Sequence, residues 1–517
     1  MLLTRSSGIL LHPTSFPGPY GIGDLGQEAY RWIDFLAQSR CGLWQLLPLG
    51  PTGFGDSPYQ CFSAFAGNPY LVSPDQLLIE GLIQEKDIES SEVFPAGVVD
   101  FGKVIPWKLQ LLDRAYEGFR KLPDEEISQE FEAFRQKNAL WLDDYTLFMA
   151  LKDAHKGKAW TKWDTGLRSR NRELLAEGRS KLALPIERHA FRQFLFFRQW
   201  NALYQYAHQH GVEIIGDAPI FIAHDSADVW AHQELYYLDL RGKPKVVAGV
   251  PPDYFSPTGQ LWGNPLYYWE IHQASGYQWW IDRIRAVLSL VDYLRLDHFR
   301  GFCGYWEVPG NARTAEKGRW VFAPGMDFFE KLQASLGDLP IIAEDLGVIT
   351  ADVIALREKF NLPGMKILQF AFGGTPKDAF LPHNYPVNCA AYTGTHDNDT
   401  VLGWYQRVPE EEKSFYRRYM ARDGSGVSWD LIRAIWSSVA VFALAPLQDF
   451  LGLDNQARMN YPGKPAGNWG WRVLENSLTD ELAGRIQEIN YLYDRQLDLK
   501  QEALIPQVEV KPENLIL

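Results

Sequence analysis

Residues 291–300 read V-D-Y-L-R-L-D-H-F-R and change abruptly from mostly apolar to charged. The apolar and aromatic start of this stretch is typical of a buried strand in a parallel sheet. Asp297, His298 and Arg300 follow at its C-terminal end, and such groups are costly to bury without partners. The stretch alone leaves two interpretations open, which are a structural cluster of ion pairs and an active site.

Seven further apolar runs have the character of strands, and helical patterns alternate with them along the chain. These runs begin at Gly8, Leu43, Val212, Pro340, Met365, Asn388 and Val439. Eight strands alternating with helices are the pattern of a (β/α)₈ barrel, the TIM barrel of the α/β class. The sequence therefore predicts a single barrel domain over residues 1–517.

Two intervals depart from the simple alternation of strands and helices. Residues 73–209 carry several helical patterns, although βα connections are usually about 2–6 residues long. We expect a mostly helical insertion subdomain there, between the second and third strands. Residues 248–267 combine Gly, Pro and aromatic residues, which indicates a loop without regular structure. This loop is either an aromatic lid over a cleft or a segment packed on the barrel rim.

Composition and charge exclude several classes of protein. The formal net charge is −13, from 51 basic and 64 acidic residues, and there is no basic run, so we expect no nucleic-acid partner. No apolar run approaches about 18 residues, so no membrane span is expected. The four cysteines have no C-x-x-C spacing and the N-terminus has no signal-peptide layout, which predicts a cytoplasmic protein.

Four of the predicted strands end in acidic residues, and the C-terminal strand ends of such a barrel share one mouth. The acids are Asp217, Asp297, Glu344 and Asp397. Clustered carboxylates repel one another and are expensive to bury without a purpose. The cluster fits two chemistries, which are metal-assisted hydrolysis and glycosyl transfer by a pair of carboxylates.

The second chemistry is favoured. Residues 396–399, H-D-N-D, look like metal ligands, but consecutive residues of an extended strand point to alternate sides and cannot all face one ion. The chain also contains 19 Trp, 24 Tyr and 29 Phe. Most of these rings are expected in the core, but aromatic walls around a mouth also suit sugars, which stack on rings.

The chain resembles the amylomaltases, the disproportionating 4-α-glucanotransferases related to the α-amylase group. The resemblance covers nearly the whole chain, in order, through 7–26, 55–60 (G-D-S-P-Y-Q), 216–220 (G-D-A-P-I), 248–267, 295–300 (R-L-D-H-F-R), 343–347 (A-E-D-L-G), 395–400 (T-H-D-N-D-T) and 457–469. It implies a TIM barrel without a C-terminal β-sandwich. It also implies transfer of α-1,4-glucan segments between maltooligosaccharides, with no cofactor and no metal.

The resemblance assigns roles to individual residues. Asp297 is expected to be the nucleophile, with Arg295 as its charged partner, Glu344 the general acid/base, and Asp397 the residue that stabilises the distorted sugar. The other residues expected to contact the substrate are Ser57, Tyr59, Asp217, Tyr254, Phe255, Trp262, His298, Phe370, His396 and Asn468. Among these, Asp217 and Ser57 have the alternative role of holding loops, and the two histidines that of structural residues.

One position departs from the resemblance, and two other functions stay open. Position 54 is Phe, where relatives can have Tyr; a second glucan-binding surface there would keep a stacking ring but lose a hydroxyl group. The alternatives to transfer are an α-glucan hydrolase of the amylase type and a non-catalytic glucan-binding protein. The sequence makes no prediction of the oligomeric state.

Overall fold

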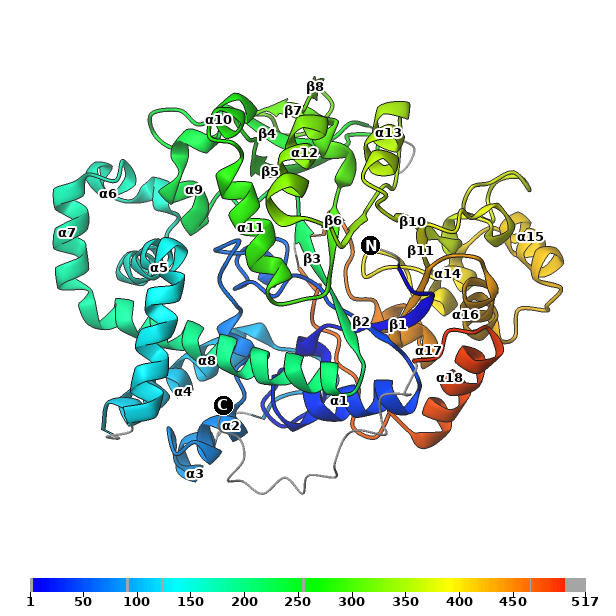
Figure 1. Cartoon of the computed structure of the whole chain (residues 1–517), viewed down its shortest axis with the longest axis horizontal. Coiled ribbons are helices and arrows are strands. Elements are labelled where there is room, and N and C mark those ends of the chain that lie inside the picture. Colours follow the sequence, from blue (N-terminus) through cyan, green and yellow to red (C-terminus); the bar gives the residue numbers. More distant parts are fainter. Residues whose placement is uncertain (1–2, 90–92, 122–124, 253–255, 465, 498–517) are drawn as a thin grey trace.

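The computed structural model describes residues 3–89, 93–121, 125–252, 256–464 and 466–497. Eight parallel strands close into a barrel (Figure 1). In their order around the barrel they are β1 (Ser6–Leu10), β12 (Phe442–Pro446), β11 (Cys389–Tyr392), β10 (Gly364–Ile367), β9 (Ile341–Ala343), β6 (Tyr293–Asp297), β3 (Glu213–Pro219) and β2 (Leu43–Gln45). Each corresponds to one of the eight predicted strands, so the predicted TIM barrel is confirmed.

Side chains at alternate strand positions fill the interior of the barrel. On β6, Tyr293 belongs to the interior cluster, whereas Leu294 and Leu296 pack in the outer core between strands and helices. Because successive side chains of a strand point to opposite faces, Arg295 and Asp297 share the inward face of Tyr293. Because the apolar residues of this strand come first, Arg295 and Asp297 lie closer to the barrel mouth than the apolar interior cluster that contains Tyr293.

Helices cover the outside of the barrel. The helix α1 (Gln27–Gln38) buries Ala29, Trp32 and Leu36, whose spacing of three or four residues makes one apolar face. The described residues between β10 and β11 form only the short 3-10 helices η7 (Leu368–Phe370) and η8 (Pro382–Asn384). The other helices after β3 are α9 (Ala227–Ala231), α10 (Trp269–Ala274), α11 (Gln278–Leu288), α12 (Gly325–Leu336), α13 (Ala351–Lys359), α14 (Val401–Arg407), α15 (Glu410–Met420), α16 (Val427–Ser437), α17 (Leu447–Phe450) and α18 (Asp480–Leu492).

A group of helices lies between β2 and β3. It comprises α2 (Pro74–Ile79), α3 (Glu85–Ile88), α4 (Phe101–Lys121), α5 (Glu125–Ala154), α6 (Thr165–Arg168), α7 (Arg172–Lys181) and α8 (Ala183–Gln209). The long helix α8 packs against α4 and α5 on one side, and against α1 and β3 on the other. Figure 1 shows this group extending away from the barrel, so that α8 joins the two parts.

A second sheet lies outside the barrel. Its antiparallel order is β5-β4-β7-β8, formed by β5 (Gln260–Pro265), β4 (Val246–Val250), β7 (Gly304–Pro309) and β8 (Arg319–Phe322). The expectation of a loop without regular structure over 248–267 is therefore wrong at both ends. The pairing of β4 with β7 joins segments that are distant in sequence, and Gly and Pro content does not reveal such pairing.

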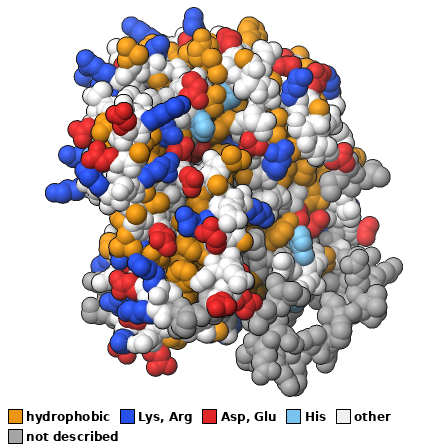
Figure 2. Space-filling view, turned by 60° about the vertical axis from the view of Figure 1, so that its left-hand side comes forward, with side chains coloured by type: hydrophobic (Ala, Val, Ile, Leu, Met, Phe, Trp, Pro, Cys, Tyr) orange, Lys and Arg blue, Asp and Glu red, His pale blue; other side chains and the backbone are white. Residues whose placement is uncertain are grey.

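Three further features concern the helices, the cysteines and the surface charge. Among the described residues, no helix is long and apolar enough to cross a membrane. All four cysteines are free thiols. Figure 2 shows basic and acidic side chains interspersed on the face that it displays. That face has no uniform basic patch of the kind that attracts nucleic acid.

Candidate active site

Asp297 and Arg295 form an ion pair at the C-terminal end of β6. The Arg295 Nη2 donates to Asp297 Oδ1 at 2.7 Å, and its Nη1 donates to Asp217 Oδ2 on β3. Parallel pairing of the two strands sets Asp217 beside Arg295 and Pro219 beside Asp297. The side chains of Arg295 and Asp217 are 4% and 0% exposed, whereas that of Asp297 is 29% exposed. Only Asp297 of the three is therefore open to a substrate.

Glu344 directly follows β9 and faces the same mouth. Its Oε2 accepts the backbone N–H of His298 at 2.6 Å, and its Oε1 accepts that of Leu346 at 3.2 Å. The backbone of Glu344 is also tied to β6, since its N–H donates to Leu296 O and its carbonyl accepts from Phe299. These bonds to backbone groups hold Glu344 beside Asp297.

Asp397 lies in the loop after β11 and is held by a different set of groups. Asn460 donates its Nδ2–H to Asp397 Oδ1 at 2.6 Å, and His396 Nε2 lies 3.2 Å from the same oxygen. Arg458 donates to the Asp397 carbonyl at 2.5 Å. The side chain of Asp397 is 43% exposed, so much of its carboxylate faces solvent.

Burial and charge shift the proton affinities of several of these groups. Burial and the neighbouring Asp297 raise the pKa of Glu344 well above its usual range. Burial raises the pKa of Asp217 to about 7, against the opposing effect of Arg295. Burial lowers the pKa of His298 to about 4 and also lowers that of His396. Both histidines are therefore neutral at pH 7, and each carries one N–H donor.

Three rings make an aromatic wall on one side of the mouth. Tyr59 stacks on the ring of His396 with centroids 5.1 Å apart, and Trp469 lies 5.7 Å from Tyr59 and 5.8 Å from His396. The Tyr59 hydroxyl donates to Asp217 Oδ2 at 2.8 Å. Ser57 accepts the backbone N–H of Tyr59 through its Oγ at 3.2 Å. Asp217 and Ser57 thus both hold Tyr59 in place, which was the alternative role considered for them.

His298 and Trp262 meet across the mouth from two different sheets. Their ring centroids are 4.8 Å apart and nearly perpendicular, at 85°. His298 has a positive φ of 55°, an uncommon backbone conformation for a non-glycine residue. This turn directs the chain away from β6 immediately after Asp297 and brings the His298 ring against β5.

Four other residues were predicted to contact the substrate, and the structure describes two of them. Phe370, the last residue of η7 directly after β10, is 47% exposed, and its ring lies 5.7 Å from that of Phe380. Asn468 accepts the Tyr461 N–H and donates to Lys464 O, so its amide is engaged within its own loop. Tyr254 and Phe255 lie outside the described residues.

Asn460 and Trp469 were not singled out from the sequence, although both lie within the conspicuous stretch 457–469. The sequence identifies this stretch only as a loop rich in Gly, Pro and aromatic residues. It does not identify the residue that bonds Asp397 or the one that covers Tyr59. Among the described residues, no group of three or more His, Cys, Asp or Glu side chains has the arrangement of a metal site. The carboxylates pair instead with Arg295, backbone N–H groups and an amide.

Comparisons with known proteins agree with this geometry. The family model described as 4-alpha-glucanotransferase matches residues 11–477. The 4-alpha-glucanotransferase of Thermus thermophilus is 52% identical over 94% of this chain and 98% of its own length. That of Synechocystis is 50% identical over 96% of this chain and 99% of its own length.

Solved structures give the same result. An amylomaltase from Streptococcus agalactiae, in complex with acarbose, has a TM-score of 0.93 and 41% identity, covering 95% of this chain and all of that one. The amylomaltase from Corynebacterium glutamicum, 18% identical with a TM-score of 0.76 over 96% of this chain and 75% of that one, shares the fold. The resemblance inferred from the sequence motifs is confirmed, and the chain belongs to the 4-alpha-glucanotransferase family.

Proposed function

We propose that this protein transfers segments of α-1,4-glucan from a donor chain to an acceptor glucan or glucose, by a retaining double displacement. The observation that carries the proposal is the pairing of two unlike carboxyl groups at adjacent strand ends. Asp297 is bonded to a buried guanidinium, whereas burial raises the pKa of Glu344. Two carboxyl groups with opposite environments suit a nucleophile and a general acid.

In the first step, the Asp297 carboxylate attacks the anomeric carbon of the donor sugar. Glu344 gives its proton to the departing glycosidic oxygen, which leaves a β-glucosyl ester on Asp297. In the second step, Glu344 takes the proton of an acceptor hydroxyl, which attacks the same carbon and releases Asp297. Two inversions retain the α configuration, and the proton on Glu344 is restored when the acceptor hydroxyl attacks.

Asp397 acts on the sugar ring during both steps. Its exposed carboxylate accepts bonds from hydroxyl groups and stabilises the positive charge of the oxocarbenium-like transition state. The neutral His298 and His396 donate to the same ring, and Tyr59 stacks on it. Transfer requires that water stays away from the ester, and the aromatic rings of Trp262, Tyr59 and Trp469 reduce its access.

We also propose the substrates of the protein and its cellular compartment. Maltooligosaccharides and longer α-1,4-glucans are the proposed donors and acceptors, and acarbose, which the Streptococcus agalactiae structure holds, is expected to compete with them. The four free cysteines support a reducing compartment such as the cytoplasm.

The test is incubation with maltotriose followed by chromatography. The proposal expects glucose together with a ladder of shorter and longer maltodextrins. Glucose and maltose without chain lengthening would instead identify a hydrolase, and no turnover would identify a binding protein. The variant Glu344→Gln is expected to abolish the ladder while it still binds acarbose, and near-normal activity in that variant would disprove the assignment of Glu344.

A further inference from the structure

The outer edge of the four-stranded sheet exposes two aromatic side chains. Its last strand, β8, pairs with β7 on one side only among the described strands. On β8, Phe322 is 88% exposed and Trp320 is 44% exposed. Because they are two residues apart on a strand, they point to the same face. Exposed aromatic residues on an unpaired edge strand are an aggregation hazard, and exposed apolar surface of this kind can mark a binding site.

Trp320 is fixed in place by its neighbours. The guanidinium of Arg300 lies 4.0 Å from its ring centroid. On the adjacent strand Trp306 is its registered partner, with ring centroids 5.4 Å apart at 65°. A ring held between a cation and a second ring loses little freedom when a ligand binds, which favours affinity.

Phe322 stands beside open space. Its registered partner across the ladder is Gly304, which has no side chain, so no ring from β7 covers Phe322. A Cβ added at Gly304 would meet only the backbone oxygen of Val321, at 3.4 Å. On the side of β7, the face of the sheet is therefore bare opposite Phe322, whereas the Trp306 ring lies opposite Trp320.

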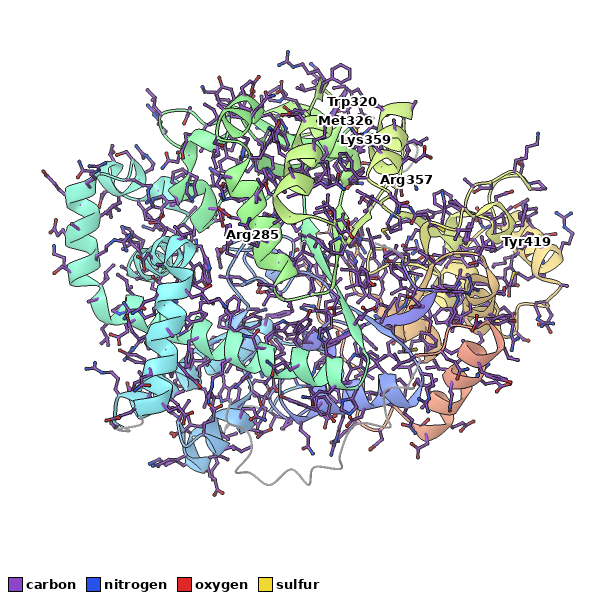
Figure 3. The ribbon with its side chains drawn as sticks, in the orientation of Figure 1. Arg285, Trp320, Met326, Arg357, Lys359 and Tyr419 are labelled. Carbon is purple, nitrogen blue, oxygen red and sulfur yellow. The ribbon has the colours of Figure 1, made fainter. Side chains whose placement is uncertain are left out.

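Arg300 connects this face with the barrel mouth. It follows Asp297 by three residues, and its Nη1 donates to the carbonyl of Val348, four residues after Glu344. The same guanidinium stacks on Trp320. Figure 3 labels Trp320 near Met326, at the edge of the molecule where Figure 1 shows β7 and β8. The two exposed rings thus lie on an extension of the segments that carry both candidate catalytic carboxyl groups.

We propose that Trp320 and Phe322, the β8 platform, bind an outlying part of an α-1,4-glucan chain whose other part occupies the barrel mouth. Pyranose rings have apolar C–H faces that stack on aromatic rings and polar edges that stay in water. Glucans carry no charge, so Arg300 serves to hold the Trp320 ring rather than to attract the chain. The choice of ligand rests on the proposed function, because only a polymeric substrate extends from the mouth to this edge.

The test compares a long and a short substrate. In Phe322→Ala, the ratio of kcat/KM for long amylose to kcat/KM for maltotriose is expected to fall about two- to ten-fold, the value of one aromatic contact. Phe322→Tyr is expected to restore the ratio. The matched control is Tyr491→Ala, which removes a 65% exposed ring on α18 and is expected to keep the wild-type ratio.

A binding measurement separates this proposal from the proposed function. In native gels that contain amylose, wild-type protein is expected to be retarded more than Phe322→Ala. An equal ratio and equal retardation for wild type, Phe322→Ala and Tyr491→Ala would overturn the platform. A second result would also overturn the platform: light scattering that shows a dimer for wild type and a monomer for Phe322→Ala, with equal retardation of both in amylose gels. The β8 face would then be an interface between two copies of the chain. If wild-type protein fails to lengthen maltotriose but is still retarded more by amylose than Phe322→Ala, only the proposed function is disproved.

Discussion

Asp297 and Asp397 lie at the same barrel mouth, but the chain holds them in different ways. Asp297 is the last residue of β6, and its partner Arg295 is on the same strand and almost fully buried. Asp397 lies in a loop five residues after β11, is more exposed, and is bonded by Asn460 from a distant loop. A carboxylate that forms a bond needs a fixed position, whereas one that bonds hydroxyl groups needs access.

The largest effect is expected for Asp297→Asn. The variant removes the charge of the proposed nucleophile, so transfer between maltotriose molecules should fall on the order of 10⁴-fold or more, measured by glucose release. The matched control is Asp292→Asn, which changes a carboxylate near the opposite end of the same strand, bonded to Tyr204 and His208. The control is expected to keep most of the activity, and comparable losses in both variants would contradict the role of Asp297.

A smaller loss is expected for Asp397→Asn. Removal of one preorganised group that stabilises transition-state charge costs about 10²–10³-fold in kcat, because the nucleophile and the acid stay in place. Steady-state kinetics with maltotriose measure this loss, and a thermal melt checks the fold. A loss as large as that of Asp297→Asn would break the distinction between the two carboxylates.

Asn460→Ala tests whether the distant loop positions Asp397. A hydrogen bond to a charged group is worth about 1.5–3 kcal/mol, so kcat/KM is expected to fall roughly 10–100-fold. Asn468→Ala is the matched control, since its amide bonds only within the same loop. It is expected to lose less, and the reverse order would assign the positioning role to Asn468.

The smallest effect concerns pH. Because Glu344, as the proposed general acid, has to be protonated to release the leaving sugar, kcat/KM should decline as pH rises through its raised pKa. Asp345 helps to raise that pKa, so Asp345→Asn is expected to move the alkaline limb to lower pH. Asp345 and Glu358 both form ion pairs with Arg357. Glu358→Gln therefore serves as the control and should leave the limb unchanged; a shift to higher pH in Asp345→Asn would contradict the electrostatic argument.

The sequence predicted the elements whose signals are local. All eight barrel strands, and the four acids expected close to strand ends, followed from short apolar runs and the residues near their ends, although Asp217 lies inside β3 and Asp397 five residues beyond β11. The antiparallel sheet was missed because β4 and β5 flank a loop rich in Gly and Pro, and because β4 pairs with the distant β7. Asn460 and Trp469 were missed for a similar reason, since their partners Asp397 and Tyr59 lie far away along the chain.

By itself, the sequence determined the eight barrel strands, because short apolar runs are visible in local residues, and its motifs determined the family. The set of carboxyl groups at one mouth followed from the barrel, whose C-terminal strand ends share one face. Only the tertiary structure decided how each group is held. In the folded chain, Asp217 is buried and accepts a bond from the Tyr59 hydroxyl, and Glu344 accepts bonds from backbone N–H groups. Asp397 accepts a bond from the Asn460 amide of another loop. Burial and hydrogen bonding arise from contacts between distant segments, and these contacts fix charge, access and therefore role.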